Sequence, residues 1–293
     1  MADTSREEWG RRRAHRKVLR ECLVHLYMIP FALVALFPLY WLVSTSVKWR
    51  GNILRFPPQW WPDPMSLENY QRLFVTSPFD RWYLNTVLIT VSATLGTVIS
   101  ACIVAYGFGR LAFRGRDFWF GILMSTMMLP NVVLIIPSFL VMKFLGWIDT
   151  YFPLILPAWL GGGAFNVFLL RQFMRTIPYE MDEAAKVDGA SPLRILVQLL
   201  VPNLKPALAV VAVFSAIGHW NSFMAPLIYL NSIEKLTLAV GMRVVTAAAA
   251  TGPGQVGVMM AAATLVTLPV LVLFATAQKY FMKGIVTTGL SGR

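Results

Sequence analysis

Acidic residues are scarce in the apolar parts of this chain, and their distribution argues against several functions. The 293 residues include 14 Asp and Glu, which fall within 1–21, 63–80, 117, 149, 180–188 and 234. None of them lies in a stretch apolar enough to cross a membrane. Transporters coupled to protons or sodium commonly use carboxylates inside the membrane. The distribution therefore argues against a transporter driven by an ion gradient.

Groups that would bind metals or catalyse reactions are also scarce. The two cysteines and three histidines are scattered, so their spacing indicates neither a disulfide nor a zinc site. Gly161-Gly162-Gly163 is not followed by the Lys and Ser/Thr of a phosphate-binding loop, and no Walker motif occurs elsewhere. No carboxylate pair or nucleophile with its base can be assembled. We therefore expect a non-catalytic chain that holds no cofactor or metal.

Long apolar stretches, in contrast, are abundant. Hydrophobic residues make up 57% of the chain and charged residues 14%, against about 25% charged in a typical soluble protein. A membrane-spanning helix needs about 20 mostly apolar residues. The sequence therefore predicts an all-α membrane protein with six transmembrane helices. They are expected at roughly 24–46, 84–108, 118–142, 151–174, 207–230 and 256–278.

The net charge of +12 is distributed unevenly along the predicted topology. Of 26 Lys and Arg, 18 fall before the first span, in 109–117, in 171–205 or after 278, which all lie on one side. By the positive-inside rule this side, with both termini, is cytoplasmic. The charge therefore indicates topology and contact with membrane lipid headgroups, and we expect no nucleic-acid partner.

These spans divide the chain into segments. We expect a basic cytoplasmic N-terminal segment at 1–23, a first span at 24–46, an external loop at 47–83, a core at 84–283 and a cytoplasmic tail at 284–293. The external loop contains Trp60 and Trp61 between prolines. Tryptophan is enriched at membrane interfaces, so we favour that location over a sugar-stacking platform. The small residues of the second span, such as Gly96 and Ser100, predict close packing against neighbouring helices.

Polar residues inside the predicted spans are candidates for a translocation pathway. Such groups are costly in lipid and tend to mark routes for a solute, although they also serve as hydrogen bonds between helices. Both interpretations stay open for the residues concerned. The candidates are Asn131, Asn166, His219, Trp220 and Asn221.

One polar stretch interrupts the apolar second half, from Pro178 to Pro192. Pro178 followed by three acids suits a helix N-terminus. Gly189 suits a left-handed helix stop, and Ser191 suits an N-cap before Pro192. The pattern predicts a helix, a glycine turn and a second helix outside the lipid.

This stretch resembles the EAA loop of ATP-binding-cassette importer permeases, in Glu183-Ala184-Ala185, Asp188-Gly189-Ala190 and Pro202. Further motifs in the same order, including Trp220-Asn221-Ser222-Phe223 and Gln278-Lys279-Tyr280-Phe281, are similar to the maltose-type branch of the carbohydrate permeases. The resemblance covers roughly residues 24–290. It implies the type I importer fold, also called MetI-like, and a coupling loop at 176–206. The residues expected to dock an ATPase are Glu183, Ala184, Ala185, Asp188 and Gly189.

The resemblance also implies an assembly. We expect a second permease subunit, two ATP-binding-cassette ATPase subunits that bind ATP and magnesium, and an extracytoplasmic sugar-binding protein. The complex would lie in a bacterial or archaeal cell (inner) membrane and import carbohydrate. Two alternatives remain, namely an ion-coupled secondary transporter and a membrane scaffold subunit without transport activity.

Overall fold

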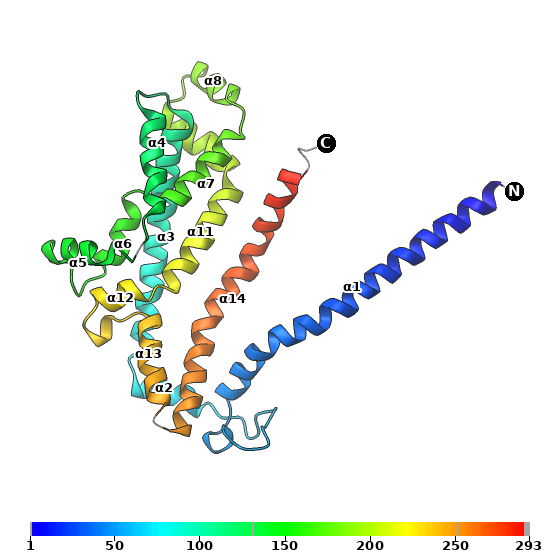
Figure 1. The fold of residues 1–293 in the computed structure, drawn as a ribbon, viewed down its shortest axis with the longest axis vertical. Helices are drawn as coiled ribbons and strands as arrows, with labels where there is room; N and C mark the ends of the chain where they lie inside the picture. Colours follow the sequence, from blue (N-terminus) through cyan, green and yellow to red (C-terminus); the bar gives the residue numbers. More distant parts are fainter. Residues whose placement is uncertain (1, 131, 251, 290–293) are drawn as a thin grey trace. The chain divides into compact units, whose positions relative to one another are not determined.

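The part of the chain that the structure describes is mostly helical and contains no β-strand beyond an isolated bridge between Lys48 and Met65 (Figure 1). The computed structural model describes residues 2–130, 132–250 and 252–289, with side chains for 20–130, 132–250, 252 and 254–278. The helices are α1 (Ala2–Ser46), η1 (Arg50–Asn52), α2 (Glu68–Thr76), α3 (Phe79–Arg110), α4 (Arg116–Ser125), η2 (Thr126–Met128), α5 (Ile135–Phe144), α6 (Phe152–Trp159), α7 (Ala164–Arg175), α8 (Glu180–Val187), α9 (Pro192–Arg194), η3 (Ile195–Leu200), α10 (Val201–Asn203), α11 (Lys205–Trp220), α12 (Met224–Tyr229), η4 (Ile233–Lys235), α13 (Leu238–Ala249) and α14 (Pro253–Gly289).

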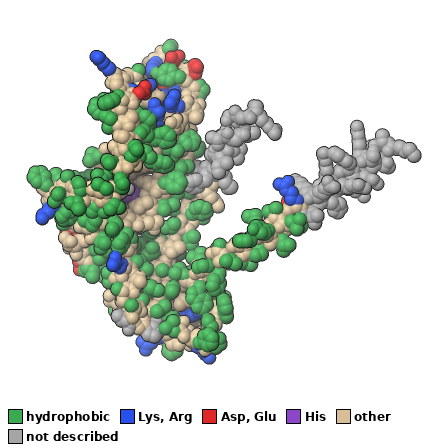
Figure 2. Space-filling model, in the orientation of Figure 1, with side chains coloured by type: hydrophobic (Ala, Val, Ile, Leu, Met, Phe, Trp, Pro, Cys, Tyr) green, Lys and Arg blue, Asp and Glu red, His purple; other side chains and the backbone are tan. Residues whose placement is uncertain are grey.

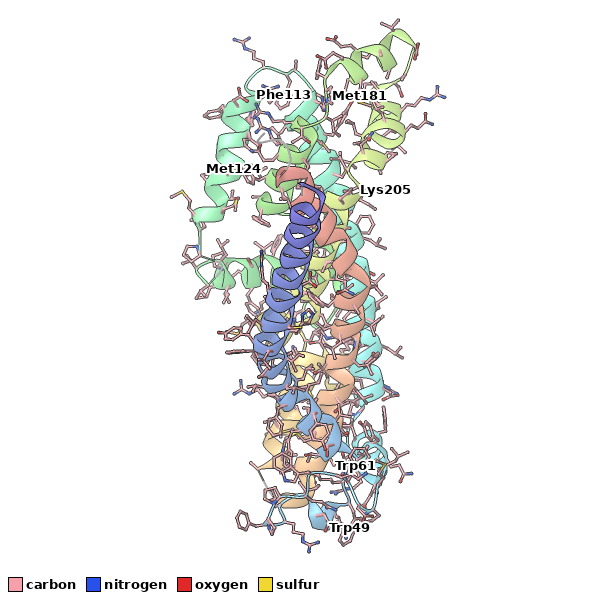
Figure 3. The ribbon with its side chains drawn as sticks, turned by 90° about the vertical axis from the view of Figure 1, so that its right-hand side faces the viewer. Trp49, Trp61, Phe113, Met124, Met181 and Lys205 are labelled. Carbon is pink, nitrogen blue, oxygen red and sulfur yellow. The ribbon has the colours of Figure 1, made fainter. Side chains whose placement is uncertain are left out.

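The chain forms two compact units. Unit 1 comprises residues 1–72 and 249–264, and unit 2 comprises 73–248 and 265–293. In unit 1, the Asn69 amide donates to the carbonyls of Ser46 and Lys48 at 3.0 and 2.8 Å, which joins α2 to the end of α1. Trp60 and Trp61 are 61% and 65% exposed, and Figure 3 shows Trp61 within the loop after α1. These exposed rings fit the predicted location at a membrane interface.

Unit 2 is built around α3, which packs most extensively against α6, α7 and α11. Small residues allow this closeness, as the sequence predicts. A Cβ on Gly162 would lie 2.4 Å from the backbone nitrogen of Ala101, and a Cβ on Gly96 would lie 2.4 Å from the Trp159 ring. Gly162 also has a φ of +67°, which side chains disfavour. Gly162 in the three-glycine turn therefore allows close packing on α3.

Among the residues that the structure describes, four helical segments are long and apolar enough to cross a membrane, or five if a bent pair of helices counts as one span. The predicted span 118–142 is not one helix, because α4 and η2 end at Met128 and α5 begins at Ile135. Pro130 explains the interruption: it lacks a backbone N–H and forces the preceding Leu129 into an extended conformation. The count of six crossings stays a prediction.

The predicted span 207–230 is also interrupted. Helix α11 ends at Trp220 and α12 begins at Met224, so the backbone opens near the predicted middle of the span. Irregular backbone at membrane depth is found where it is enclosed by protein or lines a cavity. At its other end α11 meets the segment Pro192–Asn203 at a bend of 82°. Both breaks border the sites described below.

Candidate functional site

A cavity of about 510 Å³ lies within unit 2, among α3, α6, α7, α11 and α12. Its walls combine apolar side chains with uncharged polar ones, and none of the described residues that line it is Asp, Glu, Lys or Arg. The break between α11 and α12 and the glycine turn before α7 both open onto it. The polar side chains of the lining belong to Thr86, Thr97, Asn166, Ser215, His219, Ser222 and Thr237.

The cavity brings together two of the five pathway candidates. Asn166 and His219 both line it, although they come from different helices. Trp220 is instead buried, with its indole N–H donating to the Val266 carbonyl at 3.2 Å. Asn221 is exposed and bonds to the Ile217 carbonyl of its own helix at 3.0 Å. Asn131 lies outside the described residues.

A second groove, of about 630 Å³, adjoins the first, since Ser222 and Ala225 line both. Its walls come from the segment after Asn131, from α5 and from α12, and they are mostly apolar. Helix α5 projects away from the α3–α7–α11 bundle (Figure 1). Several of its apolar side chains are highly exposed, with Phe144 at 90% and Ile136 at 71%. An exposed apolar surface of this kind is typical of a subunit or lipid interface.

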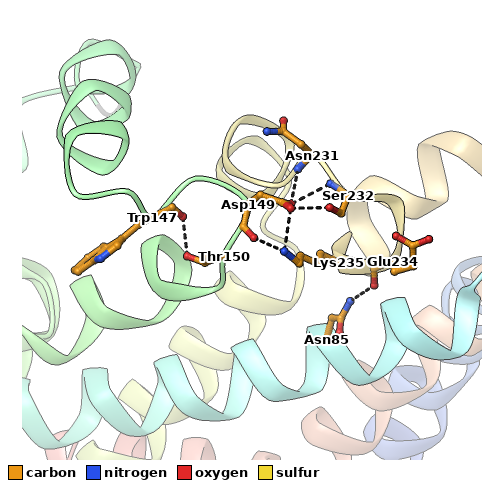
Figure 4. Close-up of polar contacts among 8 residues, drawn as sticks. All are labelled: Asn85, Trp147, Asp149, Thr150, Asn231, Ser232, Glu234 and Lys235. Carbon is orange, nitrogen blue, oxygen red and sulfur yellow. Dashed lines mark hydrogen bonds and ion pairs between the residues drawn. The ribbon is translucent and has the colours of Figure 1, made fainter.

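A polar latch, defined here as Asp149, Asn231, Ser232 and Lys235, joins the loop before α6 to the segment after α12 (Figure 4). The Asp149 carboxylate accepts hydrogen bonds from the Asn231 and Ser232 backbone N–H groups at 3.0 Å. It also accepts from the Ser232 hydroxyl at 2.6 Å and the Lys235 ammonium at 2.9 Å. These donors hold the pKa of Asp149 far below its usual range, the Ser232 bonds first among them.

The polar stretch 178–192 folds as the sequence predicts. Helix α8 ends at Val187, and Gly189 follows it with a φ of +77°. The Gly189 N–H donates to the Lys186 carbonyl at 3.0 Å and the Ala190 N–H to the Ala185 carbonyl at 2.9 Å, which is a Schellman motif. The Ser191 hydroxyl caps the following helix by accepting from the Arg194 N–H at 3.4 Å.

We call residues 176–206 the coupling segment. Glu183, Ala184, Asp188 and Gly189 are exposed on it, whereas Ala185 is half-buried against the hydrophobic core of unit 2. Acidic side chains gather over α8 in Figure 2. Large apolar side chains lie beside these acidic ones, although exposure of apolar side chains to water is unfavourable. They are Val187 at 89%, Leu193 at 66%, Val197 at 54% and Met181 at 37% exposure.

One contact of the coupling segment was not predicted from the sequence. The Asp182 carboxylate is buried and lies 3.7 Å from the Arg110 guanidinium at the end of α3. From the sequence, Asp182 is one of the acids at a helix N-terminus and Arg110 is one of the cytoplasmic charges. A lone arginine closing a long apolar helix was the available signal, but its partner lies 72 positions away.

Residues 98–287 match the family described as "Binding-protein-dependent transport system inner membrane component". The chain belongs to this family. It is a multi-pass permease subunit of an ATP-binding-cassette importer. The match includes the coupling segment and most of the residues that line the cavity.

Individual relatives cover nearly the whole permease. It is 32% identical over 272 residues to the sn-glycerol-3-phosphate transport system permease protein UgpE of Brucella abortus, covering 90% of this chain and 95% of that one. It is 30% identical over 284 residues to the maltodextrin transport system permease protein MdxG of Bacillus subtilis, covering 94% and 98%. Among solved structures it resembles a bacterial ABC transporter involved in the import of the acidic polysaccharide alginate. That match has a TM-score of 0.79 and 27% identity, and covers 90% of this chain and 96% of that one.

Proposed function

We propose that this permease forms one half of the translocation pathway of an ATP-driven carbohydrate importer. The observation that carries the proposal is the cavity in unit 2. Asn166, His219 and five hydroxyl side chains line it, and no charged residue is among the described lining residues. Hydroxyls, amides and imidazoles can donate and accept hydrogen bonds, as the hydroxyls of a sugar require. Several relatives are named for the transport of sugars, such as maltodextrin.

The proposed assembly follows from the surfaces described above. A second permease subunit would cover the apolar groove beside α5 and α12 and complete the pathway. Two ATPase subunits would bind ATP and magnesium and carry out hydrolysis, because this chain offers no residues for that chemistry. An extracytoplasmic sugar-binding protein would deliver the solute, in keeping with the family's description. Both termini would lie in the cytoplasm of a bacterial cell or an archaeal one.

The coupling segment would transmit the ATPase cycle to the permease. Its exposed face combines Glu183, which can pair with a basic group, with apolar side chains such as Val187 that a partner groove can bury. Closure of the two ATPase subunits on ATP would then tilt the spans and switch the cavity between the two sides of the membrane.

The test is purification of the tagged permease from its native membrane in mild detergent, followed by reconstitution and an assay of ATP hydrolysis. We expect an ATPase and a second permease to accompany it, with hydrolysis stimulated by a binding protein. In the same complex, Glu183→Lys should separate hydrolysis from uptake. A permease that purifies alone and transports solute driven by an ion gradient would overturn the proposal.

A further inference from the structure

Arg110, the last residue of α3, joins three elements of unit 2. Its side chain is only 3% exposed. One terminal nitrogen, Nη2, donates to the Met174 carbonyl at 2.6 Å and to the Ile177 carbonyl at 2.8 Å. Met174 lies in the last turn of α7 and Ile177 lies two residues beyond its end, and a cation is favourable at a helix C-terminus. The guanidinium therefore fixes the end of α7 to the end of α3.

The same guanidinium holds α8. Its other terminal nitrogen, Nη1, lies 3.7 Å from Asp182 Oδ1, and the Asp182 side chain is also 3% exposed. Tyr179 strengthens the junction, because its hydroxyl donates to the Arg110 carbonyl at 3.4 Å and its ring centre lies 5.7 Å from the guanidinium carbon. Helix α8 otherwise packs mainly on η3 of the coupling segment itself.

Stability alone does not account for a charge pair at this place. Replacing a buried ion pair by apolar residues of similar volume is often neutral or stabilising, whereas removing one partner leaves a buried charge uncompensated. Asp182 Oδ1 has no hydrogen-bond partner among the described residues. We therefore infer that the main effect of its attraction to Arg110 is to fix the position of α8, and that packing is secondary.

Both helices that Arg110 joins to α8 also reach the cavity. Helix α3 contributes Thr86 and Thr97 to its lining, and α7 contributes Asn166. We propose that Arg110 and Asp182 are positioning residues that transmit displacement of the coupling segment to the cavity walls. The inference rests on the proposed function and adds a specific path through unit 2 by which ATP binding changes the cavity.

The experiment uses the whole complex in proteoliposomes, with Cys22→Ser and Cys102→Ala as background. Ser215→Cys on α11, which packs against α3 and lines the cavity, reports the state of the cavity. Its rate of labelling by a water-soluble maleimide is measured with and without ATP and vanadate.

Asp182→Asn removes the charge at nearly constant volume, and Asp182→Glu retains it. Glu180→Gln, an exposed acid in the same helical turn, is the matched control.

We expect Asp182→Asn to keep the ATPase bound, because the exposed face of the segment is unaltered, and to reduce the ATP-dependent change in labelling at least threefold. Asp182→Glu and Glu180→Gln should keep that change. Arg110→Lys preserves the charge but not the forked geometry of the guanidinium, so it should also reduce the ATP-dependent change in labelling. It replaces Asp182→Asn as the test if that variant does not fold. The inference would be overturned if the ATP-dependent change in labelling of Asp182→Asn or Arg110→Lys stayed within threefold of that of the background protein. A background protein that itself shows no ATP-dependent change would instead refute the proposed function.

Discussion

At the scale of residues, the cavity depends on a few polar groups placed by breaks in the helices. His219 precedes the end of α11 by one residue, and its half-buried imidazole faces the cavity without a hydrogen-bond partner among the described residues. Asn166 lies in the first turn of α7 and is oriented by a 2.8 Å hydrogen bond from its amide to the Gly162 carbonyl. Neighbouring Trp220 and Asn221 have quite different surroundings, so adjacency in sequence does not imply a shared role.

His219→Leu should therefore impair transport without impairing folding. The leucine fills similar space but cannot bond to a solute, and loss of one hydrogen bond of about 1 kcal/mol corresponds to roughly fivefold. We expect the initial rate of solute uptake into proteoliposomes containing the whole importer to fall by about that factor, at unchanged permease yield. Asn221→Ala, which removes a side chain outside the cavity, is the comparison. Equal losses in both variants would contradict the assignment.

At the scale of elements, the latch holds two connections that are distant in sequence. Its carboxylate belongs to Asp149, which has a φ of +58°, a conformation that Asp and Asn tolerate better than most residues. A further hydrogen bond joins the loop before α6 to the end of α12, because the Asp149 N–H donates to the Tyr229 carbonyl at 2.7 Å. Nearby, the Asn85 amide of α3 donates to the carbonyls of Glu234 and Leu236 at 2.8 and 3.0 Å. The segment after α12 is thus held from two sides.

Asp149→Asn should lower the thermal stability of the permease while preserving this backbone conformation. The donors lower the pKa of Asp149, so its stabilisation is complete above the pKa of the unfolded chain, near 3.9, and declines as pH falls below that value. The partly exposed ion pair with Lys235 contributes about 1 kcal/mol after screening. We expect a melting temperature about 2 °C lower at pH 7. The difference should narrow only below about pH 4.

Asp63→Asn provides the control for this measurement, since Asp63 is an exposed carboxylate with no side-chain bond among the described residues. The melting temperature of Asp63→Asn should match that of the unaltered permease both at pH 7 and below about pH 4. A stabilising effect of Asp149→Asn at pH 7 would show that the latch is strained rather than stabilising.

Elements governed by local rules could be predicted from the sequence, and those assembled from distant residues could not. Gly189 and Ser191 specify the end of one helix and the start of the next through bonds to residues at most five positions away. Pro130 signals a break, but apolar composition on both sides suggested a continuous span. The latch and the Arg110–Asp182 pair each depend on packing that brings residues together across more than 70 positions. No periodicity reports such contacts.

At the scale of the whole molecule, the permease presents apolar side chains that it cannot bury by itself. Those within the spans can face lipid or a second permease. Those of the coupling segment lie on or just after a polar helix, α8, that begins with acidic residues. Val187 ends this helix at 89% exposure. A large apolar side chain at this exposed position is consistent with the ATPase partner proposed above.

Val187→Asp should therefore release the ATPase and leave the permease folded. The substitution is on the surface, where effects on stability usually stay within about 0.5 kcal/mol. In an interface, a buried carboxylate without a partner costs about 3 kcal/mol, which is roughly a hundredfold in dissociation constant. The amount of ATPase recovered with tagged permease measures this directly. Val75→Asp is the matched control, because Val75 is 85% exposed on α2, outside the coupling segment. If both variants retain the ATPase equally, the partner binds elsewhere on the permease.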